Sequence, residues 1–163
     1  MTATSAPRWT TRGRHSRPDP DWPTGEDWED RAERIGVAAT PLLEDLLDEF
    51  PESIVAMVCT GAGFNLCAVG LTEEAVGRFA ALSSSLHAVS SASVGALPGE
   101  KEAEPLDVVS VQAGRTLLLS ITFEHPDFGE LVLAAAVAEV TLGELLLKCR
   151  MTSTKLAREL AKI

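Results

Sequence analysis

The sequence predicts an α/β protein of the α+β type, in which helices cover both faces of one five-stranded antiparallel sheet. Helix-like and strand-like segments follow one another in the order α-β-β-α-β-β-β-α, and the first and last strand segments, 54–59 and 131–138, are the most uniformly apolar. Strands of that kind are covered on both faces, so they belong in the middle of the sheet. Joining a hairpin and a three-stranded meander at these two strands gives a three-layer sandwich with the strand order 2-1-5-4-3.

The N-terminal residues 1–37 are predicted to form a flexible tail before a domain that spans residues 38–163. The tail is basic at its start and acidic towards its end, and prolines interrupt it, which is typical of a solvated segment. Residues 24–27 can start a short helix with Trp28, Ala32 and Ile35 on one face. All three tryptophans of the chain lie in this tail, and an idle tail seldom carries three.

The domain itself is expected to begin with a helix capped by Thr40, with Pro41 at its first position. An apolar stripe runs from Leu42 to Phe50 against a row of carboxylates, and Pro51 follows it. Strand segments 54–59 and 66–69 come next, joined by a glycine-containing turn, and are interpreted as a hairpin.

The helix predicted over residues 73–96 is rich in alanine and serine, and it indicates a partner. Phe79, Leu82, Leu86 and Val89 form a stripe at i, i+3 and i+4 spacing that we expect to pack on the sheet. An ordinary surface helix would show lysine and glutamate on its other side, whereas here the other flank is short and nearly uncharged. We expect this flank to face another protein; it comprises Ala80, Ser83, Ser84, His87 and Ser91.

The strand segment 108–112 alternates, with Val109 and Val111 on one face, and is therefore expected at an edge of the sheet. Its unpaired backbone groups would lie beside the helix flank, so two copies can pair across a two-fold axis. Both features predict a homodimer with a continuous sheet, and Val109 and Val111 join the candidate interface.

The last part of the chain is predicted to hold two more strands, 116–123 and 131–138, and a helix that starts after Thr141. Thr141 and Glu144 match a capping box. Residues 152–154 are poor helix formers, so we expect the helix to bend or restart there.

Composition limits the class of partner. The formal net charge of −10 argues against nucleic acid and against anionic lipid, and no segment has the character of a membrane span. Cys59, Cys67 and Cys149 lack metal-type spacing and are interpreted as small buried hydrophobes of a reducing compartment. With an N-terminus that does not look like a secretory signal, this predicts a cytoplasmic protein.

No catalytic set, cofactor site or metal site is expected. The histidines His15, His87 and His125 lie in separate segments, and the glycine pair Gly61 and Gly63 leads into a strand, whereas a phosphate-binding loop leads into a helix. The serines of residues 83–93 lie inside a helix and not at a nucleophile elbow. We therefore predict a protein without an active site of its own.

Several segments follow one another in a recognisable order. They are the amphipathic stretch 42–47, the hairpin 54–71 with its sequence GAGFNLCAVGL, the Ala/Ser-rich helix after Gly70-Leu71-Thr72-Glu73, the strand segments 109–119 and 131–138, and Thr141-Leu142-Gly143-Glu144 before the last helix. Together these segments resemble the Roadblock (dynein light-chain) family. The resemblance covers about residues 38–163. Residues 1–36 and the long turn 124–130 depart from the family pattern.

This resemblance implies a profilin-like or Roadblock-like fold and a dimer, with itself or with a relative, built through the second helix and the third strand. It also implies a regulator or scaffold that binds a Ras-like small GTPase or a motor complex. Bacterial members often accompany a small GTPase and a sensor-kinase-like protein, and some stimulate GTP hydrolysis by arranging the GTPase's own residues. Which partner is bound, whether hydrolysis is stimulated, and what the tail contacts stay open.

Two other functions fit the residues. An acidic secretion-type chaperone would hold extended clients along exposed sheet edges. A small-molecule sensor domain would need an internal pocket with convergent polar groups, and only Cys59, Cys67, Ser120 and Thr122 could line one.

Overall fold

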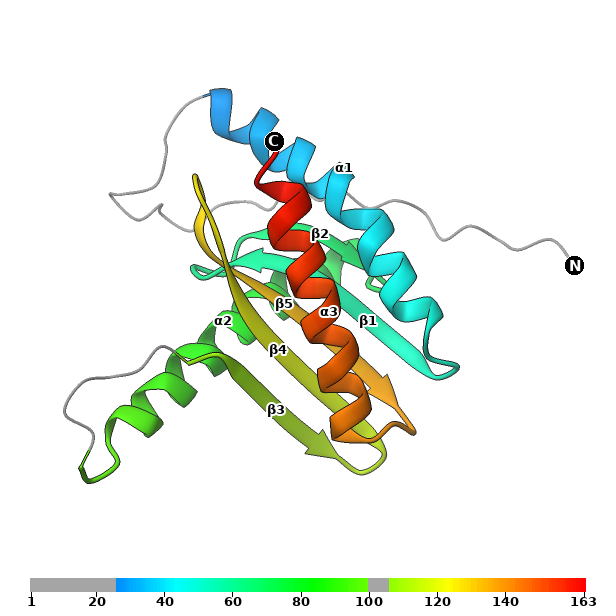
Figure 1. Ribbon diagram of the computed structural model, residues 1–163, viewed down its shortest axis with the longest axis vertical. Coiled ribbons are helices and arrows are strands. Elements are labelled where there is room, and N and C mark those ends of the chain that lie inside the picture. Colours follow the sequence, from blue (N-terminus) through cyan, green and yellow to red (C-terminus); the bar gives the residue numbers. More distant parts are fainter. Residues whose placement is uncertain (1–25, 100–105) are drawn as a thin grey trace, which may run out of the picture.

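Five strands and three helices make up the computed structural model, which describes residues 26–99 and 106–163 (Figure 1). In chain order they are α1 (Glu26–Asp48), β1 (Ser53–Thr60), β2 (Asn65–Val69), α2 (Glu73–Gly95), β3 (Val108–Ala113), β4 (Thr116–His125), β5 (Gly129–Ala138) and α3 (Leu142–Leu160). The predicted tail lies largely outside the described residues, so its flexibility stays a prediction.

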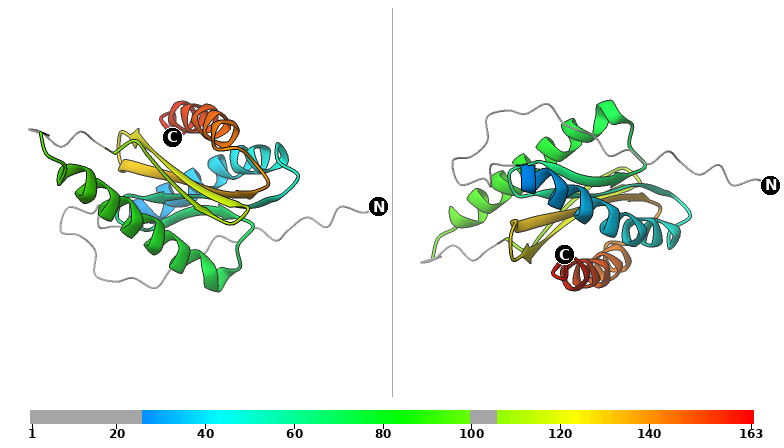
Figure 2. Two further views of the ribbon diagram at one scale, coloured as in Figure 1. Left: turned by 90° about the horizontal axis from the view of Figure 1, so that it is seen from below. Right: turned by 90° about the horizontal axis from the view of Figure 1, so that it is seen from above.

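The sheet has the predicted order β2-β1-β5-β4-β3, and every neighbouring pair is antiparallel. α1 and α3 cover one face, and α2 lies on the other, as the two views in Figure 2 show. The two central strands, β1 and β5, are buried along most of their length, because a helical layer excludes water on each side. The predicted three-layer sandwich is confirmed.

α1 differs from the prediction, because it is one helix that continues through Pro41. The expected helix start at Thr40 is therefore wrong, and the helix is unbroken across residues 37 and 38, where the tail was expected to end. Its sheet-facing stripe includes Ile35, Ala39 and Leu43, all buried in the core. Proline has no N–H, so Pro41 leaves the carbonyl of Val37 without its hydrogen bond within the helix. Both residues lie on the exposed side of α1, where water can hydrate that carbonyl. Burial of the continuous stripe outweighs the proline.

The predicted face of Trp28, Ala32 and Ile35 is confirmed within this longer helix. Ile35 is in the core and Ala32 packs against it. The Trp28 ring meets Phe64 of the β1–β2 turn edge to face, with 6.5 Å between ring centroids. The first turns of α1 are thereby held against the hairpin.

α1 approaches β2 so closely that only glycine fits at one point. A Cβ on Gly36 would lie 2.5 Å from the carbonyl oxygen of Leu66, which is closer than atoms can pack. Glycine weakens an exposed helix, but here it allows α1 to sit on the strand. α1 and α3 together bury the larger core, whose largest fully buried side chains include Leu43, Leu145 and Leu156.

α3 begins as predicted and does not restart. The Thr141 hydroxyl oxygen accepts a hydrogen bond from the Glu144 backbone N–H at 3.3 Å. The expected restart at residues 152–154 is wrong, since α3 is one helix there, and the hydroxyls of Ser153 and Thr154 both donate to the Arg150 carbonyl, at 3.0 and 2.9 Å. Their polar groups are satisfied inside the helix. Within the described residues, no helix combines the length and apolar character that crossing a bilayer requires.

Candidate interaction surface

α2 lies on the sheet mainly with the flank that was expected to face outwards. Val76, Ala80, Ser83 and His87 are buried, and Ala80 packs with Met57, Cys59, Val132 and Ala134 of the sheet. Of the predicted apolar stripe, Leu82 and Val89 face outwards, at 56% and 65% exposed, whereas Phe79 packs against the cluster under α2 and Leu86 is half-buried. Ala80, Ser83 and His87 therefore cannot be the outward-facing contact surface that the sequence predicted.

The β1–β2 turn explains this orientation. The Ser84 hydroxyl donates to the Gly61 carbonyl at 2.6 Å, and a Cβ on Gly63 would lie 3.2 Å from the Ser84 Cβ. Gly63 also has φ +90°, a conformation that favours glycine. Only a helix flank of small side chains can approach the turn this closely, so the Ala/Ser flank turns inwards. Ser84 is half-buried in this contact.

The layer between α2 and the sheet contains buried polar atoms. Ser83 Oγ and His87 Nδ1 lie on the sheet-facing side of the helix. Ser120 Oγ points to the same side, because its neighbours Leu119 and Ile121 belong to the core under α1 and α3. Within the described part of the chain none of these three atoms has a hydrogen-bond partner, which costs about 1–3 kcal/mol each. These atoms make the docking of α2 on its own sheet weaker than an apolar layer of the same size would be.

Beyond Arg78, α2 has an exposed apolar surface without charge. Its large exposed apolar side chains are Leu82 and Val89, which lie seven residues apart on the outward face, and Val94 near the end of the helix, and Leu97 follows shortly after the helix. No Asp, Glu, Lys or Arg occurs between Arg78 and Gly99. We call these four apolar residues the α2 stripe. An uncharged exposed stripe of this kind is typical of a protein contact surface.

The edge strand β3 lies beside this helix. Among the described residues it pairs with β4 alone, so its other side has free backbone groups, as predicted. Val109 and Val111 are opposite Ser120 and Leu118 in β4 and thus lie on the α2 face of the sheet. Val111 is 40% exposed and Val109 is buried. Of the predicted interface residues, Val111 is the one that is exposed, whereas Ser84 and Ser91 are half-buried.

The sequence could not identify the outward face of α2 from its pattern. Hydrophobic periodicity places the bulky stripe inwards by default. The one available signal was the glycine turn at Gly61 and Gly63, which demands small neighbours but does not say which helix supplies them.

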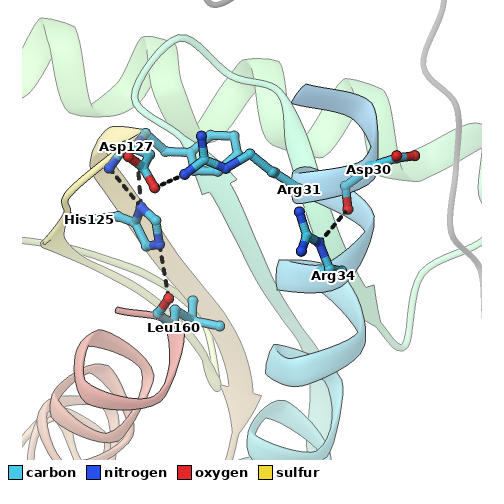
Figure 3. Close-up of polar contacts among 7 residues, drawn as sticks. Asp30, Arg31, Arg34, His125, Asp127 and Leu160 are labelled. Carbon is cyan, nitrogen blue, oxygen red and sulfur yellow. Dashed lines mark hydrogen bonds and ion pairs between the residues drawn. The ribbon is translucent and has the colours of Figure 1, made fainter. Parts of the chain in front are cut away.

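His125 ends β4 and is the centre of a polar cluster on the other side of the sheet (Figure 3). Its Nδ1 accepts from the backbone N–H groups of Asp127 and Phe128, at 3.1 and 3.3 Å. The ring proton is therefore on Nε2, which donates to the Leu160 carbonyl at 3.0 Å. Arg31 of α1 pairs with Asp127 in the same turn. Both ring nitrogens are engaged with the backbone, so His125 joins α3 to the β4–β5 turn and is not available as a base.

The other side chains that could bind a metal or act as nucleophiles do not form a site among the described residues. Residues 26–99 and 106–163 contain no group of three or more His, Cys, Asp or Glu that could hold a metal ion. Burial raises the pKa of Cys59, Cys67 and Cys149 to about 12, so these free thiols are poor nucleophiles. Their prediction as buried hydrophobes is confirmed.

The residues proposed for a sensor pocket do not line one cavity. Cys67 belongs to the core under α1, whereas Cys59 packs beneath α2. The Thr122 hydroxyl donates to the Leu106 carbonyl at 3.1 Å. The sheet separates Cys67 from Cys59, Ser120 and Thr122, which share the α2 face, so the four residues cannot line one common pocket.

No protein-family model and no curated protein sequence matches the chain. Solved structures match its fold. The Roadblock/LC7 domain from Streptomyces avermitilis is 20% identical, over 72% of this chain and 92% of that one, with a TM-score of 0.61. The gliding protein MglB from Thermus thermophilus is 21% identical, over 79% and 93%, with a TM-score of 0.65. Myxococcus xanthus MglB is 16% identical, over 80% and 97%, with a TM-score of 0.57.

These likenesses show the fold. The chain has the Roadblock/LC7 fold, as its resemblance to the Roadblock family predicted.

Proposed function

We propose that this protein is a non-catalytic regulator or scaffold that forms a homodimer through α2 and β3 and binds a small Ras-like GTPase. The observation that carries the proposal is the uncharged α2 stripe beside the free edge of β3. The Roadblock/LC7 fold supports it, since members of the Roadblock family dimerise through these two elements.

The dimer would have a two-fold axis beside β3. Such an axis brings the same patch of both subunits together, so the patch must be complementary to itself. A neutral apolar stripe satisfies this condition, because two like-charged stripes would repel. The charged residues of α2, Glu73, Glu74 and Arg78, all lie near its start, and pairing of two β3 edges would satisfy the backbone groups that α2 leaves free.

A matched pair of substitutions tests the dimer. Val89→Asp places a carboxylate in the α2 stripe, and we expect dimerisation to weaken at least thirtyfold, equivalent to about 2 kcal/mol, because the buried charge has no partner. Val37→Asp introduces the same charge at a residue that is 57% exposed on α1, on the opposite face, and should leave the dimer intact. Sedimentation equilibrium measures both. A wild-type monomer at micromolar concentration would contradict the proposal.

The GTPase partner follows from the resemblance to a family whose members bind such proteins. The similarity to two MglB structures supports a regulator or scaffold. We expect the chain to bind a small GTPase in one nucleotide state and to hydrolyse no GTP by itself. Any effect on hydrolysis would come from arranging the GTPase's own residues. Capture of the GTPase loaded with GDP or with a GTP analogue measures this preference, and equally weak capture of both forms would count against it.

We also propose a second partner and a cellular location for this protein. A sensor-kinase-like protein would be a second partner, as the resemblance implies for bacterial members. The buried free thiols and the net charge of −10 support a cytoplasmic location without nucleic acid as a partner.

A further inference from the structure

The two halves of α2 differ in what covers them. The first half buries Val76, Ala80, Ser83 and His87 against the sheet. From Ala88 to Leu97 no side chain is buried, and most are exposed. In Figures 1 and 2 this second half projects beyond the edge of the sheet. Among residues 26–99 and 106–163, no layer of the same subunit therefore lies beneath it.

The uncovered half is also a poor helix by itself. Its sequence, AVSSASVG, combines serine, valine and glycine, all less favourable in helices than alanine. It contains no charged residue, so no i, i+4 ion pair can stabilise it, and no basic residue interacts with the carbonyls of the last turn. Isolated helices shorter than about 12–15 residues are marginal in water even with good sequences.

A helix that is neither covered nor intrinsically stable frays. The buried half can nucleate it, but each further turn must then be stabilised by its own contacts. Within the described residues of one subunit those contacts are absent, while the exposed Val89, Val94 and Leu97 would supply them against a second surface.

We propose that residues 88–95 of α2 are stably helical only when a second copy of the chain covers them, so that dimerisation and folding of this half of α2 are one step. This inference rests on the proposed dimer. It means that the subunit does not carry a finished interface. The partner completes it, and the ordering cost of the segment sets the affinity of the dimer.

Hydrogen exchange of the full chain tests the ordering. In the wild-type dimer, amides of residues 88–95 should be protected. In the Val89→Asp monomer, and in wild type diluted below its dissociation constant, they should exchange within about tenfold of the random-coil rate, while amides of residues 80–87 stay protected. The dilution arm removes any local effect of the aspartate. Equal protection of residues 88–95 in monomer and dimer would overturn the inference.

Two glycines of α2 give a matched test through affinity. A Cβ on Gly95 or on Gly77 would meet no atom within 4 Å, so alanine fits at both. Gly95→Ala lies in the uncovered half and should tighten the dimer up to about thirtyfold, because each of the two subunits gains the roughly 1 kcal/mol by which alanine is favoured over glycine in helices. Gly77→Ala lies in the covered half, which is folded in both states, and should leave the dissociation constant unchanged.

The outcomes separate this inference from the proposed function. A wild-type chain that stays monomeric at all concentrations overturns both. A dimer whose affinity responds equally to Gly95→Ala and Gly77→Ala, or to neither, overturns the coupled folding and leaves the dimer standing.

Discussion

The two faces of the sheet are covered in different ways. Under α1 and α3, long aliphatic side chains such as Leu43, Leu145 and Leu156 form the larger core. Under α2, the buried cluster is smaller and comprises Met57, Cys59, Ala80, Val132 and Ala134, and among the described residues the layer includes polar atoms without partners. Since burial of apolar area is the main stabilising term, the first face carries most of the stability.

The helices on the two faces of the sheet also differ in their charged residues. α1 and α3 are connected to the rest of the molecule by ion pairs, among them Lys148 with Glu49 and Arg150 with Asp107. Beyond Arg78, α2 has no Asp, Glu, Lys or Arg with which to form one. A face that is weakly attached, apolar outside and uncharged is suited to contact with another molecule. The comparison indicates that one face stabilises the subunit and the other meets a partner.

Thiol labelling compares the two faces directly, with the largest expected effect. Burial raises the pKa of all three thiols from 9.0 to about 12. Because only the thiolate reacts, labelling near pH 8 should be roughly a thousandfold slower than for a free cysteine while the fold stays closed. Local opening then decides the order. We expect Cys59, beneath α2, to be labelled before Cys67 and Cys149, which lie in the α1/α3 core.

Mass spectrometry of the labelled peptides measures this order, and labelling in denaturant, where all three should react alike, is the control. If Cys67 or Cys149 reacted first, α2 would not be the more weakly held layer.

Truncating the larger core should have the next largest effect. Leu156→Ala removes a fully buried side chain of α3 and should lower the free energy of unfolding by about 2–5 kcal/mol. Leu82→Ala removes the same atoms from the α2 stripe and should change the stability of the monomer by less than about 0.5 kcal/mol. Urea denaturation measures both, in a Val89→Asp background that keeps the chain monomeric. Similar losses would mean that the stripe is buried within the subunit.

A glycine substitution sharpens the comparison because its sign depends on packing. Gly36→Ala should destabilise the protein by about 1–3 kcal/mol, since the new Cβ would lie 2.5 Å from the Leu66 carbonyl oxygen. Gly77→Ala, in the open, should stabilise it by up to about 1 kcal/mol. Thermal unfolding of both variants checks the opposite signs, and a gain in stability for Gly36→Ala would show that α1 does not approach β2 so closely.

The smallest effect concerns the polar atoms under α2. Ser83→Ala removes a buried hydroxyl without a partner among the described residues and should raise the free energy of unfolding by about 1 kcal/mol. Ser85→Ala is the control, because this exposed hydroxyl donates to the Ala81 carbonyl at 2.9 Å and the change in helix propensity is the same. A larger gain for Ser85→Ala than for Ser83→Ala would be inconsistent with an unsatisfied layer.

Part of the fold was predictable because it depends on local patterns. The uniform apolar runs 54–59 and 131–138 placed β1 and β5 in the centre, and the alternation of 108–112 placed β3 at the edge. Breaker residues were less reliable guides. Pro41 lies inside α1, and residues 152–154 lie inside α3, since burial of a continuous stripe and satisfied hydroxyls outweigh a local propensity.

The sequence by itself determined which segments are strands and which two strands are central. It also determined that one helix has small, uncharged side chains along one flank. Only the tertiary structure decided which flank of α2 faces the sheet. The reason is steric, because the β1–β2 turn accepts only small side chains of α2. Ser84 is hydrogen-bonded to the Gly61 carbonyl, and there is little room for a Cβ at Gly63. That constraint comes from a neighbouring element, and no periodicity within the helix can express it.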